Sequence, residues 1–98
     1  MFTIYIDGIY DLFHAGHITT LKNVKNMKKD VYLIVGLIND KEATNYKRTP
    51  IINENNRYIM LDSCKYVDKV IKNAPLVIDN NFINENNIDL VVHSCNPI

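Results

Sequence analysis

Apolar and polar positions divide this chain into four compact, mostly apolar runs separated by longer polar segments. The runs lie at residues 2–6, 31–37, 67–71 and 88–93, and most neighbouring positions in them are apolar or β-branched. This pattern is typical of strands that are covered on both faces of a parallel sheet, because a half-exposed strand would alternate apolar and polar residues. We therefore expect four strands at these positions.

The segments between the runs predict helices. The first helix is expected over residues 15–28, because apolar residues recur there every third position and lysines occupy the other faces. The expected apolar stripe consists of Ile18, Leu21, Val24 and Met27. After the second run, Asn39 and Asp40 can cap a short helical piece through Ala43. Residues 44–50 are expected to form a polar, basic loop.

Two further helices complete the pattern. Asn53 is a suitable N-cap for a helix that runs to about Cys64, and Glu54 in its first turn suits the positive end of the helix dipole. The buried face of this helix is expected to hold Tyr58, Leu61 and Cys64. Asp79 can cap a short helix over residues 80–85.

The resulting order of elements is βαβαβαβ. It predicts one α/β domain over residues 1–98 with a Rossmann-like, doubly wound parallel sheet, right-handed crossovers and helices on both faces. Ligands of such sheets bind beyond the carboxyl ends of the strands. Three polar clusters follow three of the expected strands and should meet at that edge. They are residues 7–17, residues 39–40 leading to Lys47 and Arg48, and residues 93–98.

The pattern His14-Ala15-Gly16-His17 is the strongest chemical signal in the chain. It follows the first apolar run and the turn Asp7-Gly8. If a helix begins at Ala15 or Gly16, its free backbone N–H groups and its positive dipole end face that turn. The two histidines are three positions apart and can converge on one anion, and Gly16 has no Cβ to keep a phosphate away. The spacing therefore predicts a phosphate site.

Composition and charge argue against several classes of protein. The chain has 11 basic and 11 acidic residues and a formal net charge of zero, which argues against bulk electrostatic binding of nucleic acid. No apolar segment approaches the ~18 residues that a membrane helix needs, and no signal peptide precedes the first strand. Cys64 and Cys95 do not make a disulfide framework and are expected to be small buried side chains. We expect a cytoplasmic protein.

Residues 7–17 as a whole resemble the signature of the cytidylyltransferases that activate lipid head groups. The likeness is strongest to the enzymes that use phosphocholine, with those that use ethanolamine phosphate as near relatives. It covers essentially all 98 residues. It continues at Lys47, residues 53–58, residues 64–71, residues 73–75, residues 88–89 and His93.

The resemblance implies that CMP is transferred from CTP to phosphocholine, giving CDP-choline and pyrophosphate for phospholipid synthesis. It implies direct attack of the substrate phosphate on the α-phosphorus of CTP, without a protein nucleophile. His14 and His17 would donate hydrogen bonds to the CTP phosphates as charge builds in the transition state. Lys47 would contact phosphate groups across the site. Mg²⁺ would arrive with the nucleotide, and no protein metal site is expected.

The resemblance also implies a nucleotide pocket, a head-group position and a dimer. The nucleotide residues would be Asp7, Gly8, the backbone of Ile9 and Tyr10, Gly16 and the pair His14 and His17, with His93 near the cytidine. Leu76 stands at the head-group position. The region 57–71 resembles the dimer-forming part of the family and predicts a homodimer.

The chain departs from the family pattern in three places. The family usually continues to an Arg-Thr-x-Gly-Ile-Ser/Thr signature with a further strand and helix, so we expect the domain to be incomplete at its C-terminus. An aromatic residue usually stands where this chain has Leu76. Ser94 and Ile98 replace an acid and an aromatic of the family. Because a quaternary ammonium is best held by aromatic faces and carboxylates, these changes concern head-group binding.

Several candidates have a structural alternative. Asp7 is expected to support the site, and Asp11 to stabilise the local turn. Tyr10 could pack beneath the nucleotide or fill the core, and His93 could be a satisfied histidine at the edge of the core. Arg57 is expected to pair structurally with Asp68 across a dimer interface.

Three residues outside the site are expected to be structural or inert: Arg48 is expected on the surface, and Met27 and Met60 in the core.

Three other functions fit the sequence. The first is a cytidylyltransferase for ethanolamine phosphate or glycerol phosphate. The second is a catalytically inactive nucleotide-binding or dimer partner. The third is an adenylyltransferase or a fragment of an aminoacyl-tRNA synthetase, which would prefer ATP, because those enzymes use similar two-histidine signatures.

Overall fold

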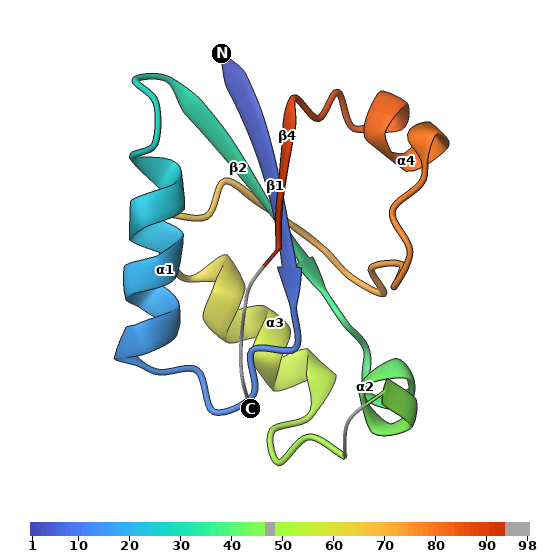
Figure 1. Ribbon diagram of the computed structural model, residues 1–98. Coiled ribbons are helices and arrows are strands. Elements are labelled where there is room, and N and C mark those ends of the chain that lie inside the picture. Colours follow the sequence, from blue (N-terminus) through green and yellow to red (C-terminus); the bar gives the residue numbers. More distant parts are fainter. Residues whose placement is uncertain (47–48, 94–98) are drawn as a thin grey trace.

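Four parallel strands form one sheet in the computed structural model, which describes residues 1–46 and 49–93 (Figure 1). The strands are β1 (Phe2–Gly8), β2 (Val31–Leu37), β3 (Lys69–Ile71) and β4 (Leu90–His93). Their order across the sheet is β3-β2-β1-β4, and every pairing is parallel. The predicted parallel α/β sheet is confirmed. The two central strands are the longest, and the two outer strands begin later than predicted.

The helices are α1 (Ala15–Lys25), α2 (Asp40–Tyr46), α3 (Glu54–Asp62) and α4 (Asn80–Glu85). The predicted N-caps Asn53 and Asp79 are confirmed, since their side chains accept the backbone N–H groups of Asn56 and Phe82. Both predicted helical segments between β2 and β3 are present, as α2 and α3.

The predicted loop from residue 44 is wrong in its first part. The helix α2 continues past Ala43 to Tyr46. Its start is well capped, because Asn39 Oδ1 accepts the N–H of Glu42 at 2.7 Å. In addition, the Thr44 hydroxyl donates back to the carbonyl of Asp40 at 2.7 Å, which satisfies a polar side chain inside the helix.

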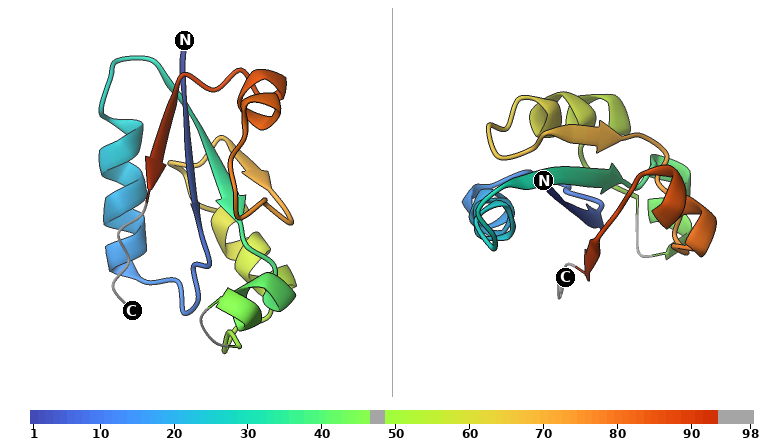
Figure 2. Two further views of the ribbon diagram at one scale, coloured as in Figure 1. Left: turned by 45° about the vertical axis from the view of Figure 1, so that its right-hand side comes forward. Right: turned by 90° about the horizontal axis from the view of Figure 1, so that it is seen from above.

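The sheet has an apolar core on each face, as the prediction of helices on both faces requires (Figure 2). On one face, α1 and α3 pack Leu21, Val24 and Leu61 against β1 and β2. On the other face, α4 packs Phe82 and Ile83 around the buried ring of Tyr5 and the β2 residue Ile34, with Ile88.

The predicted apolar stripe of α1 is correct only in its middle. Leu21 and Val24 are buried, whereas Ile18 and Met27 are 39% and 56% exposed. Met27 lies beyond the end of the helix, which stops at Lys25, so it leaves the buried face. Ile18 belongs to the first turn, at the open edge of the sheet. Met27 is therefore not part of the core, while Met60 and Cys64 are half-buried.

An aspartate precedes each outer strand, β3 and β4, and makes the same two contacts with the neighbouring inner strand. The Asp68 N–H donates to the carbonyl of Leu33, and Asp68 Oδ2 accepts the Leu33 N–H at 2.8 Å. In the same way, the Asp89 N–H donates to the carbonyl of Thr3, and Asp89 Oδ2 accepts the Thr3 N–H at 2.8 Å. Each carboxylate stands in for a missing strand residue, so the inner strand keeps a full set of partners at its amino end.

Candidate functional site

The carboxyl ends of three strands meet at one edge of the sheet. Asp7, near the end of β1, lies opposite Gly36 on β2 and His93 on β4. In Figure 1 this edge is at the bottom, where the first turn of α1 and the starts of α2 and α3 also lie. The chain therefore brings residues 7–17 and the end of β4 together, and the site is built on this edge.

The histidines His14 and His17 cap the N-terminus of α1. His14 is the N-cap residue, and its Nδ1 accepts the backbone N–H of Gly16 at 2.9 Å. The His14 N–H donates to Nδ1 of His17 at 3.2 Å. These two contacts form a capping box in which both acceptors are imidazole nitrogens. The arrangement holds the two rings together at the positive end of the helix.

The two imidazole rings are stacked. Their centroids are 4.1 Å apart and their planes are inclined by 22°. The ring of His17 also contacts Phe13 at 5.5 Å and Tyr10 at 5.4 Å. Burial and the neighbouring His14 lower the pKa of His17, while Asp11 opposes the shift. His17 is thus kept neutral near pH 7, and His14 is exposed to solvent.

Gly16 leaves room for the imidazole of His14. A Cβ at position 16 would lie 2.7 Å from Cε1 and 3.0 Å from Nδ1 of that ring. Any other residue would push the ring off its capping contact. The sequence indicated that Gly16 allows a phosphate to approach, and the structure adds that the glycine admits the histidine.

The loop from β1 to α1 has an unusual backbone. Tyr10 and Leu12 have positive φ angles of 55° and 50°, which residues other than glycine rarely adopt. The Tyr10 ring is buried against Gly8 and the core beneath His17, and its hydroxyl has no hydrogen-bond partner among the described residues. Burial, with the charge of Asp7, raises the Tyr10 pKa. Tyr10 therefore fills the core and supports the His17 ring.

Arg57 holds this loop from beneath, and sequence analysis missed that role. Its side chain is 1% exposed. Its Nη1 donates to the carbonyls of Ile9 at 2.6 Å and Ile38 at 2.9 Å, and its Nε donates to the carbonyl of Ile52 at 2.9 Å. Nη2 pairs with Asp40 Oδ1 at 2.5 Å. The arginine thus joins three segments at the site edge: the β1–α1 loop, the connection from β2 to α2, and the segment before α3.

The expected pairing of Arg57 with Asp68 across a dimer interface is wrong. Arg57 is buried within its own chain, and its carboxylate partner is Asp40. Asp68 lies at the opposite end of the sheet, where its carboxylate accepts the Lys25 ammonium and the Leu33 N–H. Position 57 could have been identified from spacing, since it shares the buried stripe of α3 with Leu61, four residues later.

Asp40 and Glu54 cap each other's helix. The Asp40 N–H donates to Glu54 Oε1 at 2.9 Å, and the Glu54 N–H donates to Asp40 Oδ2 at 3.3 Å. Each carboxylate lies at the positive end of the partner helix. Since Arg57 also binds Asp40, the starts of α2 and α3 and the site loop form one connected network.

The two aspartates of the β1–α1 region have different surroundings. Asp11 Oδ2 and Oδ1 accept the N–H groups of Ile51 and Ile52 at 2.9 and 2.8 Å, so Asp11 holds the segment before α3. This role is structural, as expected, but it connects residues 40 positions apart rather than a local turn. Asp7 is half-buried at the end of β1, and its charge helps to raise the pKa values of Tyr5 and Tyr10.

The remaining predicted residues are placed only in part. Lys47, Arg48 and Cys95 lie outside the described residues, as do Ser94 and Ile98. The backbone of His93 ends β4 beside Asp7, and its side chain is not described. Leu76 is 44% exposed, in the segment between β3 and α4.

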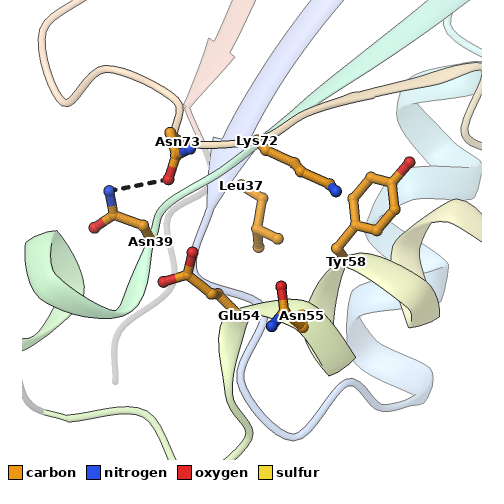
Figure 3. Close-up of a pocket in the computed structure, with 7 residues that line it drawn as sticks. All are labelled: Leu37, Asn39, Glu54, Asn55, Tyr58, Lys72 and Asn73. Atoms are coloured by element: carbon orange, nitrogen blue, oxygen red, sulfur yellow. Dashed lines mark hydrogen bonds between the residues drawn. The ribbon is translucent and has the colours of Figure 1, made fainter.

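A small hollow lies beside the site network, between α3 and the end of β3 (Figure 3). Its volume is about 10 Å³, which accommodates about one water molecule and no nucleotide. The Lys72 ammonium lies 4.1 Å from the centroid of the Tyr58 ring, and Asn39 Nδ2 donates to Asn73 Oδ1 at 3.2 Å. These contacts join residues that line the hollow.

The described residues show neither a metal cluster nor a membrane-spanning helix. Residues 1–46 and 49–93 contain no group of three His, Cys, Asp or Glu side chains arranged to hold a metal ion. In the same part of the chain, no helix has the length and apolar character needed to cross a bilayer.

Comparisons with known proteins agree with the site. Choline-phosphate cytidylyltransferase A of Rattus norvegicus and of Homo sapiens are each 44% identical to this chain over 94 residues. The ethanolamine-phosphate cytidylyltransferase of Mus musculus is 38% identical over 92 residues. These alignments cover 96% and 92% of this chain but only 26% and 23% of those relatives. The chain thus spans about a quarter of their length.

A solved structure and a family profile complete the comparison. The lipopolysaccharide core biosynthesis protein from Thermoplasma volcanium GSS1 superposes with a TM-score of 0.79 at 28% identity, over 93% of this chain and 72% of that one. The family profile described as "Cytidylyltransferase-like" matches residues 5–98. Together with the paired histidines at the head of α1, these matches show that the chain belongs to the cytidylyltransferase-like family.

Proposed function

We propose that this domain transfers CMP from CTP to phosphocholine and releases pyrophosphate. The observation that carries the proposal is the pair His14 and His17, stacked at the N-terminus of α1 with both Nδ1 atoms used by backbone N–H groups. This leaves the two Nε2 atoms to face a ligand. The 44% identity to choline-phosphate cytidylyltransferases supports the choice of nucleotide and acceptor.

The reaction needs positioning and charge stabilisation rather than a protein nucleophile. An oxygen of the phosphocholine phosphate attacks the α-phosphorus of CTP, and the bond from that phosphorus to the bridging oxygen of pyrophosphate breaks. Charge builds on the departing pyrophosphate, where Nε2–H donors and the α1 dipole are most effective. We assign His14 and His17 to this role, with Lys47 contacting phosphate groups. Gly8, the backbone of Ile9 and Tyr10, and His93 would lie beside the nucleotide.

Mg²⁺ fits this proposal as a companion of CTP. Mg²⁺ prefers phosphate oxygens and water, which the triphosphate and the solvent supply. When bound to the triphosphate it would neutralise part of the phosphate charge, and His14 and His17 would stabilise the remainder. The protein groups that would face the complex are the two Nε2–H donors and the N-terminus of α1.

Turnover with labelled CTP and each of three acceptors tests the assignment. We expect phosphocholine to be converted fastest, ethanolamine phosphate more slowly, and glycerol phosphate little. If ethanolamine phosphate alone reacts, the choline assignment is wrong and the ethanolamine alternative replaces it. The same assay with ATP in place of CTP should yield little product, because an adenylyltransferase would reverse that preference.

A catalytically inactive nucleotide-binding domain is the second candidate. Leu76 favours it, because an exposed aliphatic side chain stands where the family usually has an aromatic one to hold a quaternary ammonium. Calorimetry with CTP, combined with the turnover assay, separates the two functions. Binding of CTP without product formation supports the second candidate, and product formation excludes it.

We also propose that the domain forms a homodimer through the region that includes α3. Ile59, on the outer side of α3, is 57% exposed and so offers an apolar contact to a second copy of the chain. Sedimentation equilibrium of the chain and of Ile59→Lys tests this. A dimer that dissociates in the variant supports the proposal, and a monomer at all concentrations contradicts it.

A further inference from the structure

The capping box of α1 is built from residues that seldom form one. The described helices α3 and α4 use Asn53 and Asp79, the residue types that cap most helices. In α1 a histidine occupies both the N-cap position and the third helical position, where Ser or Thr and Glu or Gln are usual. The side chains that serve the nucleotide in the proposed function therefore also hold the start of their own helix.

The capping contacts determine where the imidazole protons are. A ring nitrogen accepts a hydrogen bond only when it carries no proton. Nδ1 of His14 accepts the Gly16 N–H, and Nδ1 of His17 accepts the His14 N–H. Each neutral ring must then carry its proton on Nε2, the atom that does not serve the helix. Both rings are consequently preset as donors toward an anion.

Proton uptake conflicts with this geometry. A proton on Nδ1 of His14 would face the Gly16 N–H across 2.9 Å, so two donors would oppose each other and the contact would break. The ring stack adds to the conflict, because two imidazolium rings with centroids 4.1 Å apart repel. Each capping contact therefore requires its histidine to be neutral.

We propose that His14 and His17 cap α1 through Nδ1, that this capping fixes both rings as neutral Nε2–H donors, and that protonation of either ring opens the first turn of α1. The inference rests on the proposed function only in naming CTP phosphates as the anion. The site is then sensitive to pH. At acid pH the first turn of α1 opens, and the two Nε2–H donors are no longer held in place.

The groups that face the pair define the direction of the effect. Among the described residues these are Asp11 and Tyr10 of the preceding loop and the two histidines themselves. Asp11 favours the protonated ring, whereas burial and the second ring disfavour it, and the pKa of His17 is lowered from the ordinary 6.5. The unfolded chain then binds the proton more readily. The stabilisation is present above about pH 6.5 and is lost as pH falls through the lower folded pKa of His17.

Histidine-resolved nitrogen NMR and amide exchange on the free chain test the proposal. At pH 7.5 both rings should show the neutral Nε2–H form. As the pH is lowered to 5, amide exchange at His14 and Gly16, corrected for intrinsic rates, should accelerate about fivefold or more, in step with imidazole protonation. The double variant His14→Asn with His17→Gln keeps an ordinary capping box, so its corrected exchange should not respond to this pH change.

The outcomes separate this inference from the proposed function. An Nδ1-protonated ring at pH 7.5, or exchange that ignores imidazole protonation, overturns the inference. With CTP bound, both rings should remain in the neutral Nε2–H form, and an imidazolium in the complex would also overturn it. If the chain fails to bind CTP but shows the predicted tautomers and acid-dependent exchange, the inference stands and the proposed function fails.

Discussion

At the amino end of the sheet, Asp68 and Asp89 precede the two outer strands and make the same pair of backbone contacts. At the carboxyl end a single buried arginine, Arg57, joins three segments. The aspartates act on the strands directly beside them. Arg57 instead connects carbonyls that lie 48 and 19 residues away along the chain. We therefore expect the contacts of the amino end to be lost independently of one another, and the Arg57 network at the carboxyl end to be lost as a unit. The edge that carries the candidate site is therefore held by contacts between more distant parts of the chain than the opposite edge is.

Removing the guanidinium should have the largest effect. Arg57→Met leaves the buried carbonyls of Ile9 and Ile38 without a donor and Asp40 without its partner. We expect urea denaturation to show a loss of about 3–5 kcal/mol in the free energy of unfolding. Arg57→Lys should recover only part of it, because an ammonium cannot span the planar set of acceptors.

The matched change at the amino end is Lys25→Met, which removes the ammonium beside Asp68. The two side chains of that pair are 27% and 30% exposed, so the expected loss is about 1 kcal/mol or less. If both variants lose similar amounts, the contrast between the two ends is wrong.

The close approach of Gly36 and Tyr5 should give the next effect. A Cβ on Gly36 would lie 1.9 Å from the Tyr5 hydroxyl oxygen and 2.9 Å from Ala74 Cβ. We expect Gly36→Ala to lower the free energy of unfolding by about 1–3 kcal/mol through overpacking. The Tyr5 hydroxyl is buried, and no partner for it exists in the described part of the chain, so Tyr5→Phe alone should cost little or stabilise. The double variant should lose less than Gly36→Ala does, and additive losses would show that the hydroxyl is not the obstacle.

The smallest expected effects concern the two aspartates. Asp68→Ala and Asp89→Ala each remove one acceptor from a backbone N–H, with an expected loss of about 1 kcal/mol in thermal or urea unfolding. The matched variants Asp68→Asn and Asp89→Asn keep an acceptor oxygen and should lose about half as much. Because the two contacts are separate, the double alanine variant should show the sum of the single losses. A strong departure from additivity would contradict the picture of independent contacts.

The parts of the fold that sequence predicted are those set by neighbouring residues. The bounds of β2 and of α4 agree with the prediction, because a continuous apolar run and the N-cap Asp79 define them locally. The end of α1 did not follow from periodicity, since Met27 continues the stripe after the helix has stopped. The late starts of β3 and β4 could have been predicted from the sequence. In both apolar runs an aspartate, Asp68 or Asp89, follows the first residue and interrupts the run before the strand begins.

The sequence predicted the histidines of the candidate site but not the residues that hold them and the neighbouring loop in place. The spacing of His14 and His17 indicated that they share one helix end, and the structure shows them stacked there. The use of their rings as acceptors for backbone N–H groups depends on ring orientation, which spacing does not reveal. Arg57 was misassigned because its partners come from loops distant in sequence, and burial of a charge is rarely expected without knowledge of its acceptors.

CTP turnover by variants that keep the helix cap but lose the Nε2–H donors tests the central claim most directly. His14→Asn and His17→Gln retain acceptors for the Gly16 and His14 N–H groups, so the free energy of unfolding should change by less than about 0.5 kcal/mol. Each variant should nevertheless lose about 10²–10³-fold in kcat for CMP transfer, the scale for losing one donor to a developing charge. Near-normal kcat in either stable variant would contradict the role assigned to that histidine.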